Sequence, residues 1–203
     1  LVCDESGVFG NWTSGGTVFC APSHAPTLVK TIQDQNLESR TREMTLVIHN
    51  GDQIPTRGIF IEMLRMFSQV WSINLTSELT DLGVRPVPVG LENLHWRRNG
   101  ELKYFDLPHL RNIQTPASKR TNLILGSFRI ETNQEVRGPL REKLTSKKGA
   151  WKEPTASPND YFNLVRSSTF VISPPGNGLD CHRTWESIYL GAIPIVLRGT
   201  LPS

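Results

Sequence analysis

The sequence has few of the features that mark several common protein classes. Its three cysteines, Cys3, Cys20 and Cys181, are too few and too far apart for a disulfide framework or a zinc knuckle. A Cys3–Cys20 disulfide in an oxidising compartment and two separate buried thiols are both open. No run approaches the roughly 18 to 20 apolar residues of a membrane-spanning helix, and no signal peptide opens the chain. We therefore expect no membrane segment within this chain.

Concentrated charge is also missing. The 203 residues include 22 Lys or Arg and 19 Asp or Glu, for a formal net charge of +3. A nucleic-acid-binding face needs a dense basic stripe, whereas here only short pairs occur, such as Arg97-Arg98 and Lys147-Lys148. With 37% hydrophobic and 20% charged residues, the composition is that of an ordinary globular protein. We expect no nucleic-acid partner, while a small anionic substrate is compatible with this charge.

Several catalytic signatures are absent as well. The chain contains no GxGxxG, no GxxxxGK[ST] P-loop, no GxSxG elbow, no HExxH and no Asp-x-Asp pair. These absences argue against a third alternative, a hydrolase or phosphatase that uses His182 and Asp180.

Short apolar runs alternate with longer mixed stretches. A helix is predicted over residues 58 to 70, and another is predicted to begin at Asn159 or Asp160 as its N-cap. The continuous apolarity of the predicted strands favours burial on both faces, as in a parallel sheet. This alternation predicts an α/β fold with Rossmann-like, doubly wound parallel sheets. The predicted strands are residues 17–21, 45–49, 70–74, 85–89, 121–126, 170–173 and 193–197.

The chain is predicted to hold two α/β units. Residues 93 to 119 are charged, aromatic and punctuated by proline, and we interpret them as the join. The units are then an N-terminal one, residues 1–115, and a C-terminal one, residues 116–203. The chain opens on Leu1 and stops a few residues after an apolar strand, so we expect small or truncated units in a fragment of a longer protein. Two sequons, at Asn11 and Asn74, fit a secretory-pathway protein, although such triplets also arise by chance.

The stretch "SPPGNGLDCHRTWESIYLGAIPIVL", residues 173 to 197, carries the clearest chemistry. Pro174 and Pro175 end a strand, the Gly176-Asn177-Gly178 segment forms a flexible turn, and a helix is predicted from Asp180 to Leu190. A glycine turn that leads into a helix N-terminus exposes unpaired amides and the positive end of the helix dipole. That combination attracts phosphate.

Helical spacing assigns a face to each side chain of this segment. Arg183 is predicted to lie opposite the buried face, in the first turn, where its donor fork meets a diphosphate. Glu186 lies one turn later and accepts hydrogen bonds from a ribose; an exposed Arg183–Glu186 ion pair is the alternative. His182 either lines the pocket or covers the sheet. The predicted buried face, a wedge of about 100°, holds Cys181, Trp185, Ile188 and Tyr189.

Residues 170 to 197, "FVISPPGNGLDCHRTWESIYLGAIPIVL", resemble the donor-site motif of exostosin-like glycosyltransferases and their uncharacterised relatives. Upstream, "VIHNGD" (47–52), "VRPVPVGLENLHW" (84–96) and "NLILGSFRIETNQEVRG" (122–138) are similar to segments of the same relatives. The resemblance implies a GT-B arrangement of two Rossmann-like domains. The implied donor is a nucleotide sugar, without a catalytic metal or other cofactor, and the acceptor is a hydroxyl on a glycan or another molecule. A secretory-pathway or Golgi location is also implied.

By the same resemblance, Glu186 binds the ribose and Arg183 the diphosphate. Arg137 is a further donor-side candidate that neutralises the departing diphosphate, since a metal-free transferase needs cationic groups there. The alternative for Arg137 is a solvated surface arginine. The remaining candidates for the donor site are Gly176, Asn177, Gly178, Asp180, His182, Arg129, Thr132 and Asn133.

The catalytic base is a weaker prediction. An inverting transferase needs a carboxylate or a histidine to deprotonate the acceptor hydroxyl. Asp52, in the Asn50-Gly51-Asp52 turn, is the candidate, although an aspartate here also serves simply to form the turn. His24, His49, Glu92 and His95 are the other possibilities. A nucleotide- or carbohydrate-binding module with the same pocket and no turnover is the alternative function.

Overall fold

The computed structural model describes residues 15–91, 115–155 and 157–199. They form two compact units, one of which covers the described residues up to Val89 and the other those from Gly90 to Arg198. The predicted join, residues 93 to 119, lies for the most part outside the described residues. So does Cys3, and both alternatives for Cys3 and Cys20, a disulfide and two separate thiols, therefore stay open.

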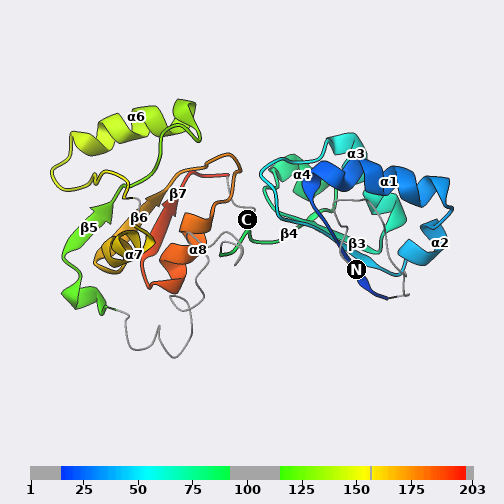
Figure 1. Ribbon diagram of the computed structural model, residues 1–203, viewed down its shortest axis with the longest axis horizontal. Coiled ribbons are helices and arrows are strands. Elements are labelled where there is room, and N and C mark those ends of the chain that lie inside the picture. Colours follow the sequence, from blue (N-terminus) through cyan, green and yellow to red (C-terminus); the bar gives the residue numbers. More distant parts are fainter. Residues whose placement is uncertain (1–14, 92–114, 156, 200–203) are drawn as a thin grey trace. The chain divides into compact units, whose positions relative to one another are not determined.

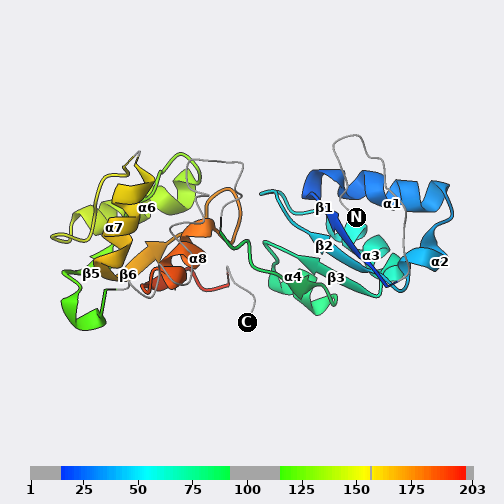
Figure 2. The same cartoon turned by 60° about the horizontal axis from the view of Figure 1, so that its bottom comes forward.

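The first unit is built on a parallel four-stranded sheet in the order β1-β2-β3-β4. Figure 1 labels most of its elements, and Figure 2 shows β1, β2 and β3 side by side. The strands are β1 (Thr17–Cys20), β2 (Thr45–Ile48), β3 (Gln69–Ser72) and β4 (Arg85–Pro86). The helices are η1 (Pro22–His24), α1 (Ala25–Asp34), α2 (Glu38–Thr41), α3 (Arg57–Met66) and α4 (Ser77–Asp81).

The described helices cover one face of this sheet. Val18, Leu46 and Val70 are in register on adjacent strands and are at most 1% exposed. They pack into the single core of the unit, against residues of α1 and α3 such as Leu28 and Phe60. The residues that follow them point to the opposite face, where Phe19 is 49% exposed. The prediction of strands buried on both faces is therefore wrong for this sheet, because successive connections in the order 1-2-3-4 place their helices on the same side.

The second unit has a parallel three-stranded sheet in the order β5-β6-β7. The strands are β5 (Asn122–Leu125), β6 (Ser168–Ser173) and β7 (Ile193–Val196). The helices are η3 (Ala117–Lys119), α6 (Gln134–Thr145), α7 (Pro158–Arg166) and α8 (His182–Tyr189). The predicted α/β class with Rossmann-like parallel sheets is confirmed.

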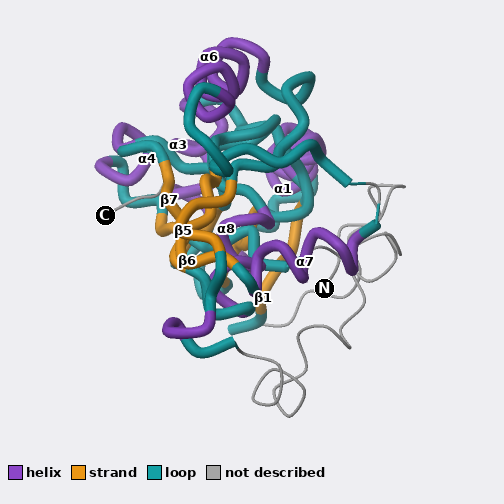
Figure 3. Tube along the Cα trace, turned by 90° about the vertical axis from the view of Figure 1, so that its left-hand side faces the viewer, coloured by secondary structure: helices purple, strands orange, loops and turns teal. Residues whose placement is uncertain are grey.

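This sheet is packed on both faces. Leu125 and Val171 are in register and bury against Phe162 and Val165 of α7. The strand residues that point to the other face of the sheet, such as Ile124, pack into a second cluster with residues of α6 and of the loop after β5. Figure 3 shows α6 and α7 on different sides of these strands. The prediction of burial on both faces is wrong for β7, because Ile193 and Ile195 on this strand are 55% and 41% exposed.

Local chemistry sets several helix boundaries. The Ser157 hydroxyl accepts from the Asp160 amide at 3.3 Å and caps α7, so the predicted cap at Asn159 or Asp160 is wrong. The helix predicted over residues 58 to 70 is α3, and it ends at Met66 because β3 begins at Gln69. Within the described part of the chain, no helix is both long and apolar enough to span a bilayer.

Candidate functional site

The carboxyl edge of the β5-β6-β7 sheet gathers most of the predicted site residues. The loop after β5 leads into α6, and the loop after β6 leads into α8, so both open at the same edge. Ligands of parallel α/β sheets bind at this edge. An open depression of about 880 Å³ lies between the start of α6 and the 176–177 turn. Most of its lining residues are polar; they are Glu131, Thr132, Asn133, Gln134, Glu135, Pro139, Gly176 and Asn177.

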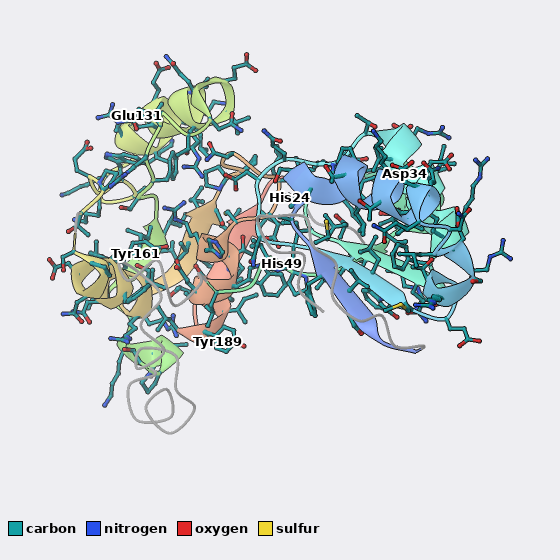
Figure 4. The ribbon with its side chains drawn as sticks, turned by 45° about the vertical axis from the view of Figure 1, so that its right-hand side comes forward. His24, Asp34, His49, Glu131, Tyr161 and Tyr189 are labelled. Atoms are coloured by element: carbon teal, nitrogen blue, oxygen red, sulfur yellow. The ribbon has the colours of Figure 1, made fainter. Side chains whose placement is uncertain are left out.

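Asn133 joins the two loops at the start of α6. Its Oδ1 accepts from the Val136 amide at 3.3 Å and caps the helix, while its Nδ2 donates to the Gly176 carbonyl at 3.1 Å. One side chain therefore orients the helix N-terminus and fixes the 176–177 turn beside it. Figure 4 labels Glu131, which lies just before this cap.

Arg137 lies beneath the same turn and is 5% exposed. Its Nε donates to the Pro175 carbonyl at 2.9 Å and its Nη2 to the Pro174 carbonyl at 3.3 Å. Its Nη1 donates to the Arg129 carbonyl at 2.8 Å and to the Thr132 hydroxyl. Burial, and then the nearby charge of Arg183, lowers the pKa of Arg137 to about 10, so the guanidinium stays protonated at neutral pH.

Gly176 fits against this guanidinium because it has no side chain. A Cβ at residue 176 would lie 2.9 Å from Arg137 Nη2. The Gly176 amide also donates to the Gly178 carbonyl at 3.0 Å, which closes the tight turn. The predicted flexible turn is therefore held by defined contacts.

Arg183 lies over two aromatic rings. Its Cζ is 5.6 Å from the ring centre of Tyr161 and 6.0 Å from that of Phe128. Its Nε is buried and has no hydrogen-bond partner among the described residues. Burial lowers the pKa of Arg183, but the electrostatic influence of Tyr161, Cys181 and Glu186 outweighs it, so the pKa lies above its usual value. Arg183 is therefore a permanent positive charge at this edge.

The predicted buried face of α8 is wrong. Ile188 and Tyr189 are 49% and 41% exposed, whereas Thr184, Glu186 and Ser187 are buried; Figure 4 labels Tyr189. The physical reason is polar packing, in which hydrogen bonds satisfy buried groups. The Thr184 hydroxyl lies 2.8 Å from that of Ser173 at the end of β6, and the Ser187 hydroxyl donates to the Arg183 carbonyl at 2.6 Å.

Glu186 is 6% exposed, so the alternative of an exposed Arg183–Glu186 ion pair does not hold. Its negative charge contributes to raising the pKa of Arg183. The pKa of the neighbouring Tyr161 is raised chiefly by burial, so its phenol is neutral at physiological pH. Glu186 and Arg183 thus belong to one electrostatic cluster, beside an uncharged aromatic wall.

Asp180 and His182 have partners of their own. Both carboxylate oxygens of Asp180 accept from Trp185 Nε1, at 3.0 and 2.8 Å. His182 Nδ1 lies 2.8 Å from the Gly90 carbonyl, and because a carbonyl only accepts, Nδ1 carries a proton and donates it there. Asp180 therefore orients the first turn of α8, and His182 ties that turn to the segment around Gly90.

The predicted base, Asp52, lies in the first unit, in the turn after β2. Its side chain is exposed, and its carbonyl accepts from Asn74 Nδ2 at 3.5 Å. The nearby His49 has Nδ1 3.0 Å from Asn50 Oδ1 and Nε2 3.2 Å from the Pro88 carbonyl. Figure 4 labels His24 and His49. Of the other candidates, Glu92 and His95 lie outside the described residues, and Asp52 as the base stays a prediction.

Comparison with known proteins adds no relative: no protein-family model matches the sequence, and no curated protein matches it. In residues 15–91, 115–155 and 157–199, no group of three or more His, Cys, Asp or Glu side chains could hold a metal ion.

The structure also brings in two residues that sequence reasoning missed, Phe128 and Tyr161. Both rings contact Arg183, although neither belongs to the motif around it. Their separation from residues 173–197 in the chain explains why spacing arguments could not find them.

Proposed function

We propose that this chain is a metal-independent glycosyltransferase that moves a sugar from a nucleotide-diphosphate sugar to a hydroxyl acceptor, such as a glycan. The observation that carries the proposal is the depression at the carboxyl edge of the β5-β6-β7 sheet. Buried Arg137 lies against Gly176 of its lining, and half-buried Arg183 lies in the first turn of the helix that follows the same loop. The similarity of residues 170 to 197 to exostosin-like glycosyltransferases supports the same assignment.

Arg183 supplies the cation that the leaving diphosphate needs. It stays charged at any physiological pH, and Phe128 and Tyr161 hold its side chain at the start of α8. It lies in the first turn of α8, where Cys181 makes no side-chain cap, so backbone amides add to the positive field. A preorganised positive site of this kind stabilises the charge that develops as the sugar–phosphate bond breaks.

The depression itself suits the sugar better than the phosphates. Glu131 and Glu135 line it, and carboxylates repel phosphate but accept hydrogen bonds from hydroxyl groups. Pro139 has no N–H, so it cannot donate to the carbonyl of Glu135. The donor sugar therefore occupies the depression, with its diphosphate towards Arg183. Glu186 binds the ribose, and Asp52 is the candidate for the catalytic base.

Nucleotide binding is the first test. Thermal unfolding of the whole chain is measured with UDP, GDP, CMP and ADP, for the wild type and for Arg183→Ala and Glu186→Ala. A nucleotide at about 100 times its dissociation constant stabilises the native state by about 2.7 kcal/mol. Arg141→Ala is the matched control, because Arg141 pairs with Glu153 instead.

Each outcome has a definite meaning. Stabilisation by one class of nucleotide that both site variants abolish and the control preserves supports the donor site. If none of the nucleotides stabilises the folded wild type, the proposal fails. Release of nucleotide diphosphate from the matching sugar donor then separates a transferase from a binding module, since the module binds without turnover.

A further inference from the structure

We propose that Arg137 is a positioning residue that holds the 174–178 loop in its ligand-binding shape, and is not itself a ligand of the leaving diphosphate. For its effect on the donor, this inference rests on the proposed function. It revises the expectation from the sequence that Arg137 neutralises the departing phosphates.

The hydrogen bonds of Arg137 carry the inference. They occupy all but one of its N–H groups, and their acceptors are the carbonyls of Pro174, Pro175 and Arg129 and the hydroxyl of Thr132. Two of these acceptors lie in the loop after β6 and the other two in the loop after β5. The guanidinium therefore fastens together the two loops that frame the depression.

Only arginine can make this set of contacts. Its planar fork spreads donors over two edges, whereas a lysine ammonium is a point charge on a flexible stem. The site is also closed to solvent, since Arg137 is 5% exposed and its Cζ lies 5.7 Å from the ring centre of Phe128. A solvated surface arginine, the alternative from the sequence, is excluded by this burial.

Gly176 is matched to the guanidinium. A Cβ at this position would come within 2.9 Å of Arg137 Nη2, a distance that real Cβ contacts do not show. The guanidinium of Arg137 therefore occupies the space that a side chain at residue 176 would need. Substitutions at the two positions are predicted to be coupled and not additive.

Hydrogen exchange at the Gly176 amide reports the loop directly, because that amide donates to the Gly178 carbonyl. We measure it by NMR for the wild type, Arg137→Lys and Thr132→Val, with Arg141→Lys as the matched control on the same helix. The expected result is exchange at Gly176 about tenfold or more faster in Arg137→Lys, a smaller rise in Thr132→Val and no change in the control. Unchanged exchange in a folded Arg137→Lys overturns the proposal.

A double-mutant cycle provides a second measurement if Arg137→Lys does not fold. Gly176→Ala alone is expected to speed the exchange of the amide of residue 176, which donates to the Gly178 carbonyl, relative to the wild type. In an Arg137→Met background, Gly176→Ala is expected to change the exchange rate little further, because the Nη2 atom that the new Cβ would clash with is absent. An equal effect of Gly176→Ala in both backgrounds would show that residues 137 and 176 are not coupled.

Nucleotide affinity separates this inference from the proposed function. If Arg137 positions the loop, Arg137→Lys weakens nucleotide binding and speeds loop exchange together. If Arg137 is a direct ligand, affinity falls while exchange at Gly176 stays as in the wild type, and the inference fails. If the wild type binds none of the nucleotides, the proposed function fails, while the exchange data still decide what Arg137 does to the loop.

Discussion

Arg137 and Arg183 share one aromatic ring: their Cζ atoms lie 5.7 and 6.0 Å from the ring centre of Phe128. Two like charges on one ring repel, and the charge of Arg183 adds to burial in lowering the pKa of Arg137. The ring of Phe128, which is itself buried, makes a cation–π contact with each of the two guanidinium groups. The like charge of Arg183 is therefore part of the environment that disfavours the protonated form of Arg137.

Phe128→Ala is predicted to destabilise the second unit strongly. The ring is 1% exposed and packs edge-on against Trp151 at 5.0 Å, so its removal leaves a cavity. We expect a loss of about 3 to 5 kcal/mol in the free energy of unfolding, measured by urea denaturation. Leu123→Ala, on a side chain that is 69% exposed, should change it by less than about 0.5 kcal/mol. Equal effects of the two substitutions would contradict the packing described.

Asn133 is predicted to have two separable roles. Asn133→Ala removes the cap of α6 and the bond to the Gly176 carbonyl, and should cost about 1 to 2 kcal/mol in unfolding free energy. Asn133→Asp keeps an oxygen for the Val136 amide but loses the Nδ2 donor. We expect the aspartate variant to retain α6 stability and still to speed exchange at the 176–178 turn. An aspartate variant with wild-type exchange would show that the bond to Gly176 is unimportant.

The contacts of Glu153 predict that the free energy of unfolding depends on pH in the acid range. Its Oε1 accepts from Trp151 Nε1 at 2.8 Å and from Arg141 Nη2 at 3.0 Å. The hydrogen bond from Trp151, and then that from Arg141, lowers the pKa of Glu153 below its usual value. The unfolded chain then takes up the proton first as the pH falls, so this contribution is present above about pH 4.5 and is lost as the pH drops through the folded pKa.

The measurement is the stability of the wild type and Glu153→Gln by denaturation from about pH 7 to about pH 3. The advantage of the wild type should shrink as the pH falls. Glu142→Gln, at an exposed position of α6, is the control and should track the wild type. A constant difference between the wild type and Glu153→Gln across this range would contradict the assignment.

The sequon at Asn74 is predicted to carry no glycan in the folded protein. Asn74 is 4% exposed, and its Nδ2, the atom that a glycan would join, donates to the Asp52 carbonyl. Peptide mass spectrometry of the chain secreted from a glycosylating host checks this prediction. A fully occupied Asn74 in folded protein would contradict the described environment. The other sequon, at Asn11, lies outside the described residues.

The sequence by itself determined the α/β class and the positions of most strands. Apolar runs such as residues 45 to 49 are short, rich in β-branched side chains and bounded by turn residues, and these are local properties. It also located the loop before α8, because Pro174, Pro175 and the glycines that follow act on their own backbone. Local chemistry is readable from local sequence.

Only the tertiary structure decided which side chains of that region are buried and what they contact. Helical spacing placed Ile188 and Tyr189 inside, yet the fit of Thr184 to Ser173 at the end of β6 turned a polar face inward. Arg137 binds the Pro175 carbonyl across 38 positions of the chain. Such contacts depend on how parallel strands bring distant loops to one edge. No periodicity within a single segment records that arrangement.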